Sequence, residues 1–151
     1  MYNKILLPSD GSDSAEKAAK HALWIAVKSG ADILVLNVFE LYTPTIAFPI
    51  STLAGSNEDL YEPLKKEAEK IADDLIDRIK ASDEFKSGNI NINRIVREGN
   101  PYNEILKTVE ENEIDLIVMG ASGRHGFDRI ALGSETERVV RASHVPVLVV
   151  L

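Results

Sequence analysis

The chain has 151 residues, of which 44% are hydrophobic and 27% charged, as expected for a single globular domain over residues 1–151. Its 17 basic and 24 acidic residues give a net charge of −7, and it has no cysteine. The acidity argues against general nucleic-acid binding, and the lack of cysteine excludes disulfides and thiolate chemistry. Without a signal-peptide pattern or a run near the ~18 apolar residues of a membrane span, we expect a cytoplasmic protein.

The first third of the chain predicts a strand, a helix and a second strand. Residues 4–7 are apolar and end at a proline, which indicates a short buried strand. Asp13 and Glu16 resemble a capping box at the start of a helix. Small apolar residues then recur at helical spacing, and Gly30 ends the helix. Residues 33–39 are almost continuously apolar, which predicts a strand buried on both faces of a parallel sheet.

The middle of the chain predicts a long connection followed by a helix and a strand. Residues 40–58 contain two prolines and several apolar residues, which is typical of a lid or an interface segment. A helix is predicted over residues 60–80, with Pro63 in its first turn. Residues 82–89 predict a polar loop, and residues 90–97 a third strand near the edge of the sheet.

The last third continues the alternation of helices and strands. A helix starts at Asn100, with a proline at its first position, and is followed by a strand over 114–119, a helix over 134–143 and a strand over 145–151. This order predicts an α/β fold in which a parallel sheet has helices on both faces and right-handed crossovers. Ligands of such sheets bind beyond the carboxyl ends of the strands, where the strand order reverses.

A glycine pattern follows the strand at 114–119. Gly120-Ala121-Ser122-Gly123 is separated by nine residues from Gly133-Ser134, which opens the last helix. Glycine lets a backbone approach a ligand closely, and the free N–H groups and dipole of a helix start attract anions. We therefore predict a nucleotide phosphate site here. Ser134 is expected to cap its helix, to contact phosphate, or to do both.

The remaining chemistry in the sequence favours binding over catalysis. Arg124 is a candidate for neutralising phosphate, as are His125 and Arg129, with plain solvent exposure as the alternative. The sequence contains no Ser–His–Asp order, no metal-ligand cluster, no paired-carboxylate signature and no Gly-Lys-Ser/Thr of a phosphate-binding P-loop. A nucleotide site with no evident device for activating water indicates a signalling or regulatory protein.

Over its whole length the chain resembles the universal stress protein family, in particular its ATP-binding branch. The resemblance rests on Pro8-Ser9-Asp10-Gly11-Ser12, on Leu36-Asn37-Val38, on the glycine pattern, and on the closing Pro146-Val147-Leu148-Val149-Val150. It implies an open, Rossmann-like sheet of five parallel strands in the order 3-2-1-4-5. It also implies a homodimer that forms through the last strand, Val147 to Leu151, whose edge lacks protection.

The resemblance also implies a set of nucleotide-binding residues. Asp10 matches the family's acidic residue beside the adenosine, with an Asx-type turn bond as its alternative role, and Val38 matches the position whose backbone meets adenine. Glu135 departs from the family pattern: pointing inward it would repel phosphate, and pointing to solvent it would favour the helix dipole. The expected site residues are Pro8, Ser9, Asp10, Val38, Gly120, Ser122, Gly123, Arg124, Gly133, Ser134, Glu135 and Thr136.

Together these features suggest a homodimeric, ATP-dependent switch in the stress response. In this hypothesis ATP, with Mg²⁺ as a candidate ion between its phosphate oxygens, orders the loop from Gly123 to Gly133 and changes a surface that an unidentified protein partner contacts. We expect no nucleic-acid or membrane partner. Two alternatives stay open, which are an interaction scaffold of the same fold without nucleotide and a slow ATP hydrolase.

Overall fold

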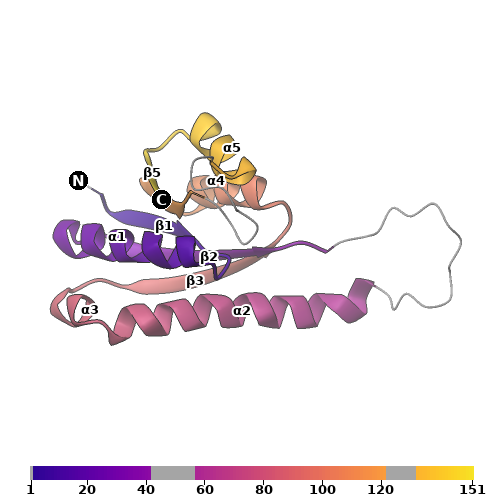
Figure 1. Cartoon of the computed structure of the whole chain (residues 1–151), viewed down its shortest axis with the longest axis horizontal. Helices are drawn as coiled ribbons and strands as arrows, with labels where there is room; N and C mark the ends of the chain where they lie inside the picture. Colours follow the sequence, from indigo (N-terminus) through magenta and orange to yellow (C-terminus); the bar gives the residue numbers. More distant parts are fainter. Residues whose placement is uncertain (1, 42–56, 122–131) are drawn as a thin grey trace, which may run out of the picture.

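The computed structural model, which describes residues 2–41, 57–121 and 132–151, is a five-stranded parallel sheet with helices on both faces (Figure 1). The strands are β1 (Lys4–Pro8), β2 (Asp32–Phe39), β3 (Ile92–Glu98), β4 (Leu116–Gly120) and β5 (Val147–Val150). The helices are α1 (Asp13–Ser29), α2 (Asn57–Ala81), α3 (Asp83–Ser87), α4 (Pro101–Glu111) and α5 (Ser134–Ala142). The strand order is β3-β2-β1-β4-β5 with parallel pairing throughout, so the predicted fold class is confirmed.

Two apolar cores lie on opposite faces of the sheet, because successive side chains of a strand point to opposite sides. In β1, Ile5 and Leu7 pack in the core under α1 and α2, whereas Leu6 packs in the core under α4 and α5. Burying one such side chain contributes about 2 kcal/mol. The buried face of α1 consists largely of alanines, which lets this helix lie close to the sheet. These alanines are Ala15, Ala18, Ala19, Ala22 and Ala26.

The start of α1 differs from the capping box expected at Asp13 and Glu16. Ser12 is the N-cap, and its hydroxyl accepts a hydrogen bond from the amide of Ala15 at 3.2 Å. Glu16 forms an ion pair with Arg78 of α2 instead of turning back to its own helix end. The contact with a neighbouring helix, which local spacing does not reveal, determines where this carboxylate lies. Gly30 ends the helix at φ 76°, as expected for a glycine C-cap.

The segment from α2 to α3 corrects two sequence predictions. α2 begins at Asn57, so Pro63 lies inside the helix and not in its first turn. The acidic residues that precede the proline favour a helix start, which offsets part of the cost of the missing N–H. Residues 83–87 form a short helix where a polar loop was expected, because the Ser82 hydroxyl caps it by accepting from the Phe85 amide at 3.3 Å.

The other strands fall within two residues of their predicted bounds, and β3 lies at one edge of the sheet, as expected. β5 forms the other edge. Most of the connection over 40–58, predicted as a lid or interface segment, lies outside the described residues. Within the described part of the chain, no helix is long and apolar enough to cross a membrane.

Candidate functional site

The strand order reverses between β1 and β4, which lie side by side in the middle of the sheet. Their register pairs Leu6 with Ile117, so both strands end at the same edge. β1 leads into α1 on one face of the sheet, and β4 leads toward α5 on the other. Crevices at such reversal points are the usual ligand sites of open α/β sheets. The loops predicted to bind a ligand therefore start at adjacent points.

The loop after β1 is held by one hydrogen bond from β2 and by two within the loop. The Asn37 side chain donates to the Ser9 carbonyl at 2.8 Å. The Ser9 hydroxyl accepts from the Gly11 amide at 3.3 Å, and the Asp10 carboxylate accepts from the Ser12 amide at 3.0 Å. Asp10 thus makes the Asx-type bond expected as its alternative role.

β2 brings Val38 to the same edge of the sheet. The register Pro8↔Leu36 puts Val38 and Asp10 each two residues beyond a paired position. The Val38 side chain is half-buried and packs toward the core under α4 and α5. Asn37 is a buried polar residue whose role the sequence analysis missed. The signal was present, because an amide in a strand of apolar residues needs a buried partner.

Gly120 is required by packing, independently of any ligand. A Cβ atom at this position would lie 2.2 Å from Ser14 Oγ and 2.8 Å from the Ser14 carbonyl carbon. Since Ser14 belongs to the first turn of α1, the glycine lets this helix lie directly against the end of β4. The Ser14 hydroxyl oxygen is itself buried and makes no hydrogen bond within the described part of the chain.

The first turn of α5 differs from the sequence prediction. Gly133 is the N-cap, with φ −60° and ψ 150°, and no side chain of the described residues makes a cap hydrogen bond there. Ser134 is exposed at the first helical position, so its predicted capping role is wrong. The buried Thr136 hydroxyl donates to the Gly120 carbonyl at 3.1 Å, and the Gly133 amide donates to the Ala121 carbonyl at 2.7 Å. These two bonds attach the start of α5 to the end of β4.

Glu135 lies in neither of the two orientations considered from the sequence. Its carboxylate accepts a hydrogen bond from the Tyr102 amide, in the first turn of α4, at 3.0 Å. The other carboxylate oxygen is 3.5 Å from the Arg138 guanidinium. The Arg138 guanidinium in turn lies 4.1 Å from the centre of the Tyr102 ring, within cation–π range. The carboxylate therefore contacts the N-terminus of a neighbouring helix.

Part of the predicted site lies outside the described residues. This applies to Ser122, Gly123 and Arg124, and to His125 and Arg129, the other two candidate cations. The structure brings the remaining predicted residues to the end of β1 and β2 or to the contact between β4 and α5. Among residues 2–41, 57–121 and 132–151, no group of three or more His, Cys, Asp or Glu side chains is arranged to hold a metal ion.

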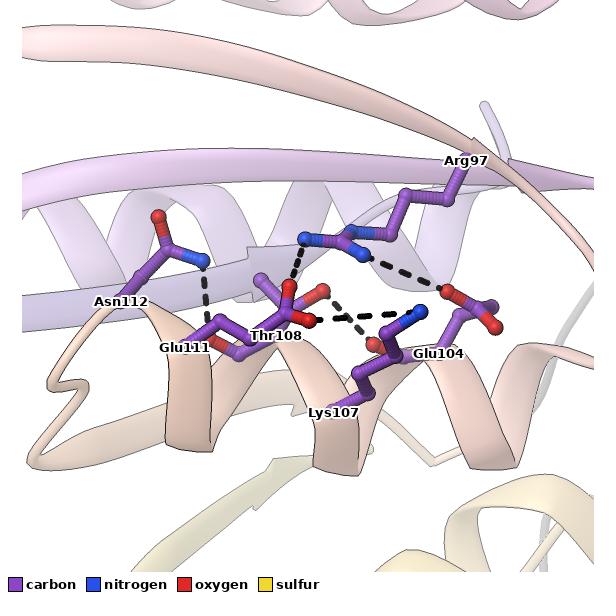
Figure 2. Close-up of polar contacts among 6 residues, drawn as sticks. All are labelled: Arg97, Glu104, Lys107, Thr108, Glu111 and Asn112. Carbon is purple, nitrogen blue, oxygen red and sulfur yellow. Dashed lines mark hydrogen bonds and ion pairs between the residues drawn. The ribbon is translucent and has the colours of Figure 1, made fainter.

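A second polar cluster, between β3 and α4, was not predicted from the sequence (Figure 2). The Arg97 guanidinium lies between Glu104, at 3.6 Å, and Glu111, at 2.5 Å. The Lys107 ammonium lies 4.0 Å from the Glu111 carboxylate, on the exposed surface of the helix. Arg97 and Glu104 are both largely buried. The signal available was the spacing of seven residues between the two glutamates, which puts both on the same face of α4.

Comparison with known proteins gives consistent results across the whole chain. The model of the universal stress protein family matches residues 1–150. Universal stress protein MJ0531 of Methanocaldococcus jannaschii is 39% identical over 150 residues, which cover 99% of this chain and 82% of the relative. Universal stress protein MJ0577 of the same organism is 33% identical over 156 residues, covering 99% and 95% of the two chains.

Solved structures agree with this result. The MJ0577 structure superposes with a TM-score of 0.74 at 33% identity, covering 99% of this chain and 96% of its own. The universal stress protein UspA from Lactobacillus plantarum has a TM-score of 0.80 at 27% identity, with coverages of 99% and 98%. A universal stress protein in complex with cAMP has a TM-score of 0.58 at 26% identity, with coverages of 99% and 96%.

Proposed function

Because the chain belongs to the universal stress protein family, we propose that it binds ATP where β1 and β4 end and acts as a nucleotide-dependent switch. The observation that carries the proposal is the N-terminus of α5. The helices α1, α3 and α4 begin with a side-chain cap from Ser12, Ser82 and Asn100, whereas α5 has none from the part of the chain that the structure describes. The first amides of an uncapped helix are available to bind an anion.

In this proposal the adenosine and the phosphates occupy different parts of the sheet edge. Asp10 and the Val38 backbone hold the adenosine, and the first turn of α5 with Gly133 and Ser134 holds the phosphates. The complex of a structural neighbour with cAMP supports an adenine nucleotide as the ligand class. The remaining proposed contacts are Pro8, Ser9, Gly120, Ser122, Gly123, Arg124 and Thr136. Of these, Arg124 would neutralise phosphate charge and Thr136 would support the helix start.

Mg²⁺ is proposed between the phosphate oxygens, because this ion is usually held by substrate phosphates with few protein ligands. The proposal also includes a cytoplasmic location, because the ligand is a cytoplasmic metabolite. The switch acts by changing a surface near the site when nucleotide binds, and an unidentified protein partner contacts that surface.

The test of the ligand is calorimetric titration with ATP, ADP and AMP, preceded by mass spectrometry of nucleotide released from the purified protein. We expect bound adenine nucleotide and saturable ATP binding. The double variant Gly123→Val with Gly133→Val should lose that binding while the protein stays folded by circular dichroism. Unchanged ATP affinity in this variant would show that the phosphates bind elsewhere.

A homodimer through β5 is also part of the proposal. β5 is an edge strand, and hydrogen bonds from Ile117 to the Pro146 carbonyl and from Ala121 to the Val150 carbonyl show which of its backbone groups face β4. In a parallel ladder the alternate residues, including Val149, direct their amides outward. Val149→Pro removes one outward donor and leaves the β4 pairing intact. Sedimentation should change from dimer to monomer, and a dimeric variant would contradict this interface.

A further inference from the structure

Tyr102, Glu135 and Arg138 form a cluster, here called the α4–α5 clamp, that joins the first turns of two helices. It combines a hydrogen bond of 3.0 Å from the Tyr102 amide to Glu135, a Glu135–Arg138 ion pair of 3.5 Å, and an Arg138–Tyr102 cation–π contact of 4.1 Å. Each member contacts the other two. The Glu135 side chain is partly shielded from water, with an exposed fraction of 38%.

The clamp matters because Glu135 carries a negative charge on the first turn of α5. Without other contacts, such a carboxylate turns toward the positive end of its own helix, which is where a phosphate would also bind. Here the carboxylate instead accepts a hydrogen bond from the first turn of α4, and Arg138 balances its charge. Glu137, the other acidic residue of this turn, is paired with Arg141 at 2.8 Å. Both carboxylates near the uncapped amides are therefore neutralised by arginines.

We propose that Glu135 is a positioning residue for anion binding, which the clamp holds against α4 so that its charge stays away from the α5 N-terminus. This inference rests on the proposed function, since it concerns the same phosphate site. It explains how this helix start could bind phosphate although a glutamate stands in its first turn. It also predicts that Arg138 acts on the ligand through Glu135 and not by direct contact.

The first variant is Arg138→Gln, which removes the ion pair and the cation–π contact. Glu135 is then freed from its charge partner and keeps only the hydrogen bond from the Tyr102 amide among the clamp contacts. We expect the Kd for ATP, measured by calorimetry, to rise about fivefold or more, because a freed carboxylate repels phosphate at the helix start. The Kd for adenosine, which has no phosphate, should change less than about twofold. If Arg138 has a purely structural role, the substitution should weaken the binding of ATP and of adenosine to the same extent, and that result would overturn the inference.

The second variant distinguishes an effect of Arg138 through Glu135 from a direct contact between Arg138 and the phosphates. In the double variant Glu135→Gln with Arg138→Gln, no carboxylate is left to be freed, so ATP affinity should return to within about twofold of the wild type. Glu135→Gln alone keeps an oxygen to accept from the Tyr102 amide and removes the charge, so ATP affinity should rise by about threefold. If the double variant stays as weak as Arg138→Gln, Arg138 contacts the phosphates directly and the inference is wrong.

Arg141→Gln is the matched control. It leaves the clamp intact and frees Glu137, whose side chain is half exposed at 51%, so that water screens its charge. Its ATP affinity should change less than about twofold. Thermal unfolding of each variant verifies that it is folded under the titration conditions. If the wild type binds neither ATP nor adenosine, the proposed function fails. If the wild type binds ATP but Arg138→Gln leaves the preference for ATP over adenosine unchanged, only the inference about Glu135 fails.

Discussion

The N-termini of α4 and α5 lie next to each other but differ in the side chains that bind their first backbone amides. At α4, Asn100 supplies a side-chain cap, Pro101 occupies the first helical position, and Glu135 accepts a hydrogen bond from the Tyr102 amide. At α5, Gly133 is the N-cap, and among residues 2–41, 57–121 and 132–151 no side chain caps the helix. One of the carboxylates that begins α5 thus contributes to α4. The two helix starts have the same backbone chemistry, so the difference between them lies in their side chains. The start of α5 is the one to which the proposal assigns the phosphates.

The largest expected effect on stability comes from displacing the end of β4, to which the first turn of α5 is hydrogen-bonded. Gly120→Ala places a Cβ atom 2.8 Å from the Ser14 carbonyl carbon, so α1 or β4 must move. We expect a loss of about 3 kcal/mol in the free energy of unfolding, measured by urea denaturation without nucleotide. ATP affinity should also fall, because the Gly120 carbonyl is the acceptor for Thr136.

Gly88→Ala is the control for this overpacking effect. Its Cβ would also meet a neighbour at 2.8 Å, but that atom is a side-chain methyl of the half-buried Val27 and not backbone. The cost should be less than about 1 kcal/mol. Equal losses at Gly88 and Gly120 would show that the close approach of α1 to β4 is not the cause.

The next prediction concerns the ion pairs that attach α4 to β3. Arg97→Gln leaves the largely buried Glu104 without its cation (Figure 2). We expect a loss of about 2 kcal/mol in thermal or urea unfolding, because a shielded carboxylate without a partner is costly. Lys107→Gln removes an exposed charge from the same cluster and should cost less than about 0.5 kcal/mol. Similar losses in both variants would argue that the cluster is only a surface ion pair.

These contacts mark the limit of what the sequence predicted about the fold. Buried strands such as residues 33–39 and the cap at Asn100 follow from local patterns, and both were predicted. Glu16, Ser134 and Glu135 were placed less well. The partner of Glu16 is on α2 and that of Glu135 is on α4, and a local pattern contains no information about the neighbouring helix.

At the candidate site, the sequence indicated which residues matter but not the contacts that they make within the protein. The glycine pattern spans the connection from β4 to α5, but the structure gives Gly120 a packing reason of its own, its contact with Ser14, which no spacing rule reveals. Thr136 was expected near phosphate, and its hydroxyl bonds the Gly120 carbonyl. Both residues are thus needed to assemble the helix start, whether or not they also touch a ligand. Their ligand contacts remain predictions.

Giving α5 the cap that it lacks tests the comparison from the ligand side. In Gly133→Asp, the new carboxylate can accept from first-turn amides that no described side chain caps, and a φ of −60° suits any residue. The nucleotide-free protein should become slightly more stable, by a few tenths of a kcal/mol. The Kd for ATP should rise about tenfold or more, since the carboxylate occupies and repels the anion site. Greater stability with unchanged ATP affinity would place the phosphates away from this helix.

Removing a cap from α4 is the reverse experiment and has the smallest expected effect. The Asn100 side chain accepts from the Asn103 amide at 3.4 Å, a long bond, while Glu135 serves a different amide of the same turn. Asn100→Ala should therefore cost about 0.5–1 kcal/mol in unfolding, and Asn100→Ser, which keeps a cap, only a few tenths. ATP affinity should be unchanged in both. If it falls in Asn100→Ala, the two helix starts are coupled beyond the clamp, and α4 contributes to the nucleotide site as well as to stability.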